Sequence, residues 1–232
     1  MIISDKHRYV YIGIPRNGSK SMNHWLSEYF DGRNHGGHHD YDVPEEAAGY
    51  LVFTIVRNPY DRRTSGHFAV TWDDQAPTEE ELGDCSSKPE RLQKFRAILK
   101  SREKQRQREM PRQSTVPLDE RIREAVLSNE SEGHDINQKG YVDRGQVNLV
   151  LYFERLPECL RELPFVDPDD VPPFPHHPER GIRPAGDFFD FFRGTDEEEV
   201  VWAHAAEDFK AFGYRRHDCG LPEDAPCALR IR

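Results

Sequence analysis

The fold is decided by the stretch Tyr9-Val10-Tyr11-Ile12-Gly13-Ile14-Pro15-Arg16-Asn17-Gly18-Ser19-Lys20-Ser21-Met22. A run of β-branched and aromatic residues leads into a turn that contains proline and glycine. Apolar residues at helical spacing then follow: Met22, Trp25, Leu26 and Tyr29. This pattern predicts a strand over 8–14 that turns into a helix over 19–30. The first N–H groups of such a helix have no partner within it, so the turn is suited to holding an anion.

A second stretch of the same kind runs from residue 51 to residue 65. Leu51 to Val56 is continuously apolar, which is typical of a central parallel strand buried on both faces. Arg57-Asn58-Pro59-Tyr60-Asp61-Arg62-Arg63-Thr64-Ser65 follows, and Pro59 suits the first turn of a helix. A further strand is predicted over 147–153, and a last helix runs from a cap at 195–198 to Gly213. The chain is therefore predicted to be an α/β protein with a central parallel sheet flanked by helices.

Composition narrows the class of protein. A length of 232 residues suits one domain with a buried core. The net charge of −10 argues against a general nucleic-acid binder. No apolar run approaches the roughly 20 residues that cross a bilayer, and no signal peptide precedes the first strand. The four cysteines lack metal-ligand spacing and suit a reducing compartment, so we predict a soluble cytoplasmic protein without a membrane segment.

The middle of the chain, residues 71–137, differs from the rest in its charge pattern. It is predicted to be a helical insertion on the side that would receive a second substrate, the acceptor. Residues 88–108 are predicted to form a basic helix with an apolar stripe at Leu92, Phe95, Ile98 and Leu99. Its basic face could attract an anionic acceptor, or it could be an ordinary solvated helix face, which the pattern favours.

The first turn carries several groups that suit a phosphate. Arg16 supplies a charge that does not titrate, Gly18 allows close approach, and residues 19–21 add N–H groups and side-chain donors. The competing interpretation is a P-loop nucleotide triphosphatase. Gly13 and Gly18 have the Walker separation, but Ser19 intrudes, so Lys20-Ser21 comes one position late.

The second turn offers a different kind of anion site. Arg57 lies at the carboxyl end of the predicted strand, and Ser65 follows about two helical turns later. An arginine fork and a hydroxyl can clamp one phosphate, with one or two bonds from the arginine. Two such turns could hold a nucleotide phosphorylated at both ends of its ribose.

Together these motifs resemble those of sulfotransferases that use 3′-phosphoadenosine 5′-phosphosulfate (PAPS). Residues 15–21 are similar to the 5′-phosphosulfate loop of that family, and residues 57–65 are similar to its 3′-phosphate motif. Three further segments resemble signatures of the carbohydrate, or Golgi-type, branch: 137–141, 152–156 and 208–214.

The resemblance implies a P-loop-like three-layer fold with PAPS as donor, PAP as product and no metal. The residues it implies for the nucleotide are Arg16, Asn17, Gly18, Ser19, Lys20, Ser21, Arg57 and Ser65. The chain departs from the family in two places. Arg16 stands where many members have lysine, and Lys20 stands where threonine or serine is usual, so the partner of the 5′-phosphate stays open.

Sulfuryl transfer to a hydroxyl needs a general base as well as Arg16. Related enzymes use a histidine or a glutamate, and the sequence offers His38 or His39 without deciding between them. The reserves are His35, His67, Asp40 and Asp42. Glu154 is the other candidate, although a structural hydrogen-bond acceptor is favoured there. Metal binding by the histidines is a less favoured alternative.

The sequence therefore predicts sulfuryl transfer from PAPS to a hydroxyl, less readily an amine, of a small-molecule or carbohydrate acceptor that could be anionic. The alternatives are an ATP-dependent P-loop kinase and a non-catalytic module that binds a nucleotide or glycan. The identity of the acceptor and the oligomeric state stay open.

Overall fold

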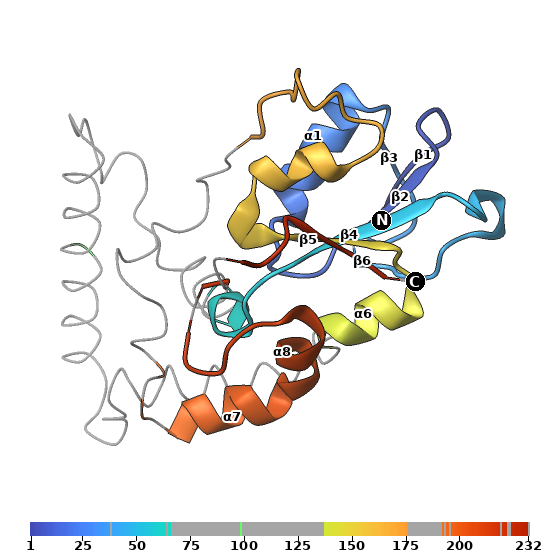
Figure 1. The fold of residues 1–232 in the computed structure, drawn as a ribbon. Coiled ribbons are helices and arrows are strands. Elements are labelled where there is room, and N and C mark those ends of the chain that lie inside the picture. The colour runs from blue at the N-terminus through green and yellow to red at the C-terminus, as the bar shows by residue number, and fades with distance from the viewer. Residues whose placement is uncertain are drawn as a thin grey trace. The chain divides into compact units, whose positions relative to one another are not determined.

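The computed structural model describes residues 1–37, 39–63, 65, 98, 137–175, 192, 194, 196–218, 220–221 and 224–231 (Figure 1). The chain divides into two compact units. One comprises Met1–Ser65, Asn129–His177 and Gly186–Arg232, and the other comprises Gly66–Ser128 and Pro178–Ala185. Ile98 is the one described residue of the second unit, and every helix and strand named below belongs to the first. The predicted insertion 71–137 and its basic helix otherwise lie outside the described residues, Asn137 excepted, and the single-domain prediction stays a prediction.

A six-stranded sheet forms the centre of the first unit, in the order β3-β1-β2-β4-β5-β6. The strands are β1 (Ile2–Ser4), β2 (Tyr9–Ile12), β3 (Arg33–Asn34), β4 (Leu51–Val56), β5 (Leu149–Tyr152) and β6 (Ala228–Arg230). The three central strands are parallel, with Tyr11 opposite Phe53 and Phe53 opposite Leu149. The outer strands β1, β3 and β6 are antiparallel to their neighbours. The predicted α/β fold and its parallel centre are confirmed, whereas the antiparallel edges were not predicted.

Helices cover both faces of this sheet, as Figure 1 shows, with α1 on one face and α6, α7 and α8 on the other. They are α1 (Ser19–Tyr29), α6 (Gln138–Arg144), α7 (Asp196–His204) and α8 (Ala206–Phe212). Three 3₁₀ helices complete the described elements: η1 (Glu45–Ala47), η2 (Phe153–Arg155) and η3 (Glu158–Glu162). The prediction of one last helix is wrong, because the chain leaves helical geometry at Ala205 (φ −108°, ψ 16°). Gly213 ends α8 in the left-handed region, as predicted.

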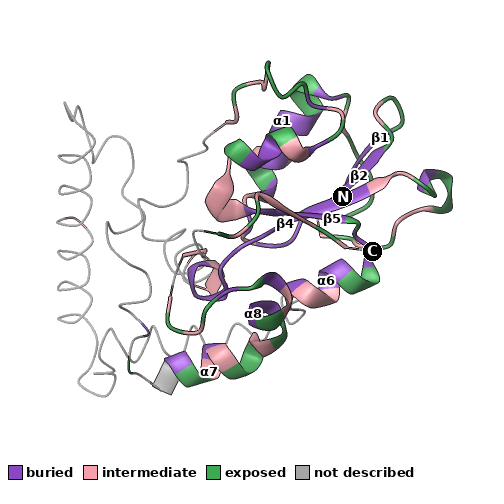
Figure 2. Ribbon diagram, in the orientation of Figure 1, coloured by how far each residue is buried: buried purple, intermediate pink, exposed green. Residues whose placement is uncertain are grey.

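Burial follows the central strands, which run through the core in Figure 2. Trp25 and Leu26 of α1 belong to the same fully buried cluster as Phe53 and Leu151. Residues 52–56 of β4 are all buried, as expected for a strand covered on both faces. Because β2 and β4 are adjacent and parallel, the turns that follow them emerge at the same edge of the sheet.

Within the described ranges, the helices are too short or too polar to traverse a lipid bilayer.

Candidate functional site

The first loop, residues 13–21, includes the first turn of α1 and begins with a tight turn at the end of β2. The N–H of Asn17 donates to the carbonyl of Ile14 at 3.3 Å, which closes a four-residue turn. Pro15 fixes a negative φ at the second position, and Arg16 has φ +70° at the third, the combination of a type II turn. That third position normally holds glycine, so Arg16 keeps its side chain at the cost of backbone strain.

The loop then enters α1 through Gly18, which also has a left-handed φ of +76°. A Cβ at this position would lie 3.1 Å from the ring of Phe153, so both the conformation and the space favour glycine. Gly18 is the N-cap of α1 and has no side chain with which to cap it. The first-turn amides have no carbonyl one turn back within α1, and the helix dipole places partial positive charge there, which makes this end of α1 suitable for an anion.

The second loop, residues 57–65, follows β4 and is built differently. Asn58 accepts the N–H of Tyr60 through Oδ1 at 3.0 Å, and helical residues begin at Pro59, so Asn58 acts as the N-cap. The backbone N–H of Arg57 donates to Gln138 Oε1 at 2.8 Å. The N–H of Asn58 donates to Glu154 Oε1 at 2.6 Å. Since the amides of Arg57, Asn58 and Tyr60 are occupied, the donors that these residues can offer an anion are on their side chains.

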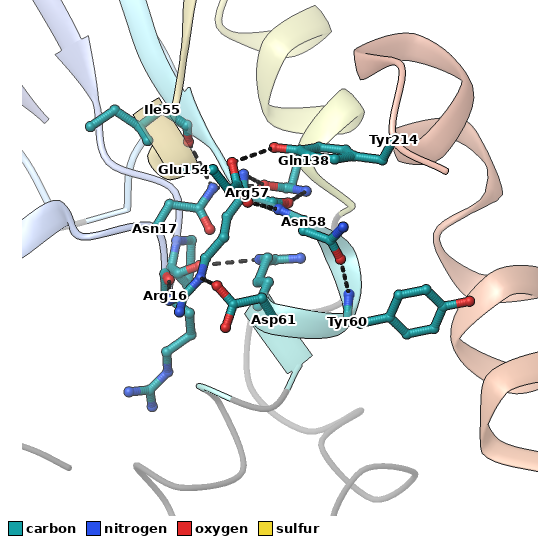
Figure 3. Close-up of polar contacts among 12 residues, drawn as sticks. Arg16, Asn17, Ile55, Arg57, Asn58, Tyr60, Asp61, Gln138, Glu154 and Tyr214 are labelled. Carbon is teal, nitrogen blue, oxygen red and sulfur yellow. Dashed lines mark hydrogen bonds and ion pairs between the residues drawn. The ribbon is translucent and has the colours of Figure 1, made fainter. Parts of the chain in front are cut away.

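Arg57 is the cation at the centre of the site, and its side chain is 2% exposed. Its Nε donates to Asp61 Oδ2 at 2.6 Å, and its Nη1 donates to the carbonyl oxygen of Arg16 at 2.7 Å (Figure 3). The guanidinium carbon lies 4.1 Å from the ring centre of Phe153. The buried Nη2 has no hydrogen-bond partner among the described residues. One donor of the fork is thus left for a ligand, and an unpaired buried donor calls for an explanation.

A second arginine ties the two loops together. Arg62 Nε donates to the carbonyl oxygen of Pro15 at 3.1 Å. Burial lowers the pKa of Arg62, and the negative charge of Asp208 opposes that shift. Arg57 and Arg62 therefore both bind carbonyl groups of the first loop. Figure 3 shows that the side chain of Arg16 extends away from this network, in contrast to its carbonyl.

The other predicted nucleotide contacts fall into two groups. Asn17 is fully buried, and its Nδ2 donates to the carbonyl of Ile55 and to Gln138 Oε1, both at 2.7 Å. Its side chain thus braces the loop from inside, and a direct contact with a ligand stays a prediction. In the first turn of α1, Ser19 is buried, Lys20 is exposed and Ser21 is half-buried; Ser65 is half-buried as well.

Of the two predicted base candidates, the structure describes His39. Its Nδ1 lies 2.7 Å from the carbonyl oxygen of Gly13. Because a carbonyl only accepts, Nδ1 carries the proton and Nε2 carries the lone pair of the neutral ring. Burial lowers the pKa of His39, and the bond to Gly13 opposes that shift; the charges of the N-terminal ammonium, Arg16 and Arg62 reinforce it.

His38 lies outside the described residues, as does the reserve His67. His35, another reserve, is exposed. The choice between His38 and His39 therefore stays a prediction.

Glu154 has both carboxylate oxygens engaged. Oε1 accepts the N–H of Asn58, and Oε2 accepts the hydroxyl of Tyr214 at 3.1 Å. Burial raises the pKa of Glu154, and these two hydrogen bonds oppose the shift. The carboxyl group thus holds the second loop against the C-terminal segment, in the manner of a structural acceptor.

Sequence reasoning missed the role of Gln138 and Asp208. Asp208 accepts the N–H groups of Gln138 at 3.1 Å and of Lys139 at 2.8 Å, which joins α8 to the start of α6. Both residues fall within segments that resemble the carbohydrate branch, at 137–141 and 208–214. That resemblance was the only available signal, because contacts between residues 69 or more positions apart leave no local pattern.

The comparisons with protein-family models, with curated proteins and with solved structures found no match for the chain. In the part of the chain that the structure describes, no three His, Cys, Asp or Glu residues are grouped as a metal site would need. The fold and the site define a mixed α/β protein in which two arginine-bearing loops meet at one edge of the sheet.

Proposed function

We propose that this protein is a PAPS-dependent sulfotransferase with a P-loop-like arrangement of sheet and first helix. One observation carries the proposal: Arg57 bridges both loops and keeps one buried donor without a partner among the described residues, beside the N-terminus of α1, where the N-cap Gly18 has no side chain to cap the helix. A ligand with two anionic groups on one small scaffold would satisfy both features.

The residues present fit such a nucleotide. On the 5′ side, the amides of residues 18–21 and the charge of Arg16 would hold the phosphosulfate, with donors from Ser19, Lys20 and Ser21. On the 3′ side, Arg57 Nη2 and Ser65 would hold the phosphate. Bound PAPS supplies an activated sulfuryl group, whose bond to the 5′-phosphate oxygen breaks as the acceptor oxygen bonds to sulfur.

The chain's own residues would assist this in-line transfer by electrostatics and positioning. Arg16 and the first-turn amides stabilise the negative charge that grows on the 5′-phosphate oxygen. His39 Nε2 accepts the proton of the acceptor hydroxyl, and its lowered pKa keeps it neutral and able to do so at pH 7. His38 remains the alternative base. The proposed acceptor is a hydroxyl of a small molecule or carbohydrate, and the proposed location is the cytoplasm.

Calorimetric titration of the whole chain with PAP, ATP and 5′-AMP, without magnesium, tests the donor class. We expect PAP to bind more tightly than either of the other nucleotides. Tighter binding of ATP, with no affinity for PAP, would replace the proposal with a kinase. Retained PAP affinity, with no labelled product from radioactive PAPS across a broad acceptor panel, would indicate a non-catalytic binding module.

Two serine variants form a matched pair for the same titration. Ser65→Ala removes a hydroxyl from the second loop, so PAP affinity should fall by roughly tenfold while 5′-AMP affinity stays the same. Ser21→Ala removes a hydroxyl from the first loop, so the affinities for both nucleotides should fall together. If Ser65→Ala weakens both nucleotides equally, the 3′-phosphate is wrongly assigned to the second loop.

A further inference from the structure

One buried amide side chain joins the two loops without facing a ligand. Gln138 is fully buried at the start of α6. Its Oε1 accepts from Asn17 Nδ2 at 2.7 Å and from the backbone N–H of Arg57 at 2.8 Å (Figure 3). Its Nε2 donates to the carbonyl of Arg57 at 2.8 Å and to Asp208 Oδ2 at 3.3 Å. All four hydrogen bonds available to a primary amide are therefore made.

The pattern of these bonds requires an amide. A carboxylate would accept from Asn17 and Arg57 but would repel the Arg57 carbonyl and the carboxylate of Asp208. A hydrocarbon side chain would leave several buried polar groups without a partner. Because Gln138 holds both the N–H and the C=O of Arg57, it fixes the backbone from which the guanidinium extends.

The position of Gln138 is itself fixed by neighbouring elements. Asn137 caps α6 by accepting the N–H of Gly140 at 2.7 Å. Asp208 of α8 accepts the backbone N–H of Gln138 and that of Lys139. The amide is thus a rigid link between α8, α6 and both loops.

We propose that Gln138 is a positioning residue that sets the separation of the two loops, and therefore the distance between the two anionic groups that one ligand can span. This inference rests on the proposed function. It assigns Gln138 no contact with ligand. Its effect should appear for ligands that engage both loops and should be small for ligands that engage one.

The test compares Gln138→Met with Lys139→Met in the whole chain. The two changes are adjacent in α6, but the side chain of Lys139 pairs with Asp143 and does not reach the loops. The probes are PAP, 5′-AMP and 3′-AMP. In Gln138→Met we expect PAP affinity to fall by about tenfold or more, and the affinity for either monophosphate by less than about threefold, because the advantage of linked binding is lost. In Lys139→Met all three affinities should stay the same.

Equal loss for PAP and both monophosphates, or no loss of PAP affinity, would overturn the positioning role. Asn17→Ala is the second variant, since it removes one bond of the same network and should produce a smaller selective loss. If wild-type protein fails to bind PAP, the proposed function fails.

In that case hydrogen exchange still tests the link. Exchange at the Arg57 amide should accelerate about tenfold in Gln138→Met, while the Asn58 amide, held by Glu154, changes less. Unchanged protection at Arg57 would refute the link itself.

Discussion

The strained turn at Arg16 gives a prediction in which two substitutions differ only in the backbone. Arg16→Ala and Arg16→Gly both remove the guanidinium, but only glycine relieves the left-handed φ of +70°. A left-handed conformation costs a residue with a Cβ roughly 1–2 kcal/mol. Glycine loses about 0.5–1 kcal/mol through the greater freedom of its unfolded chain. Arg16→Gly should therefore be more stable than Arg16→Ala by about 0.5–1 kcal/mol.

Urea unfolding of the two variants measures this difference. With a typical denaturant dependence, the midpoint of Arg16→Gly should lie about 0.3–0.5 M above that of Arg16→Ala. The same pair of substitutions at His24 is the control, because this exposed position lies in the middle of α1. There the order should reverse, since glycine in a helix interior costs about 1 kcal/mol relative to alanine.

The two Arg16 variants should also lose the same affinity for PAP, because they lose the same charge. The reasoning about the turn is refuted if Arg16→Ala unfolds at the same or a higher urea concentration than Arg16→Gly.

Three further predictions concern buried charge and the base. Asp61→Asn leaves the buried guanidinium of Arg57 without its ionic partner and should lower the free energy of unfolding, measured in urea, by about 3–5 kcal/mol. Lys139→Met breaks an exposed ion pair and should cost at most about 1 kcal/mol. Equal costs would contradict the inference that the Arg57–Asp61 pair is buried. The raised pKa of Glu154 means that the folded state binds the Glu154 proton more tightly than the unfolded state does. The free energy of unfolding should therefore fall as pH rises from about 4.5 through the folded pKa. Glu154→Gln should flatten this pH dependence, and an unchanged slope would exclude Glu154 as its source. His39→Gln should lower turnover by about 10²–10⁴-fold while PAP affinity is retained. In the wild-type protein, kcat/KM should fall on the acid side at a pH below the usual histidine pKa. Normal turnover of His39→Gln would mean that another residue is the base.

The parts of the fold that the sequence predicted are those with strong local patterns. The apolar run Leu51–Val56 coincides with β4, and the helix predicted over 19–30 is α1, Ser19–Tyr29. The outer antiparallel strands β1, β3 and β6 have two or three residues each, which is too short for an alternating pattern to stand out. The single predicted last helix was wrong for a related reason, since the break at Ala205 falls at a residue with high helix propensity.

The site was predictable to the extent that its residues lie next to strand ends. The positions of Arg16 and Arg57 follow from the order of strand and turn, and their loops do lie in contact. The use made of each side chain was not predictable. Asn17 faces inward, and two of the three guanidinium nitrogens of Arg57 donate to Asp61 and to the Arg16 carbonyl. The Asn17 side chain and the Arg57 backbone N–H both bind Gln138, which comes more than 80 positions later in the chain.

The bond from Arg57 to the Arg16 carbonyl also limits how this protein can be redesigned or can diverge. Because Arg57 and Arg62 of one loop both hold carbonyl groups of the other, inserting or deleting even one residue in either turn would move a carbonyl or a guanidinium out of register with its partner. Surface loops usually tolerate changes in length. Here the lengths of the two turns are coupled, so a change in one turn would require a compensating change in the other.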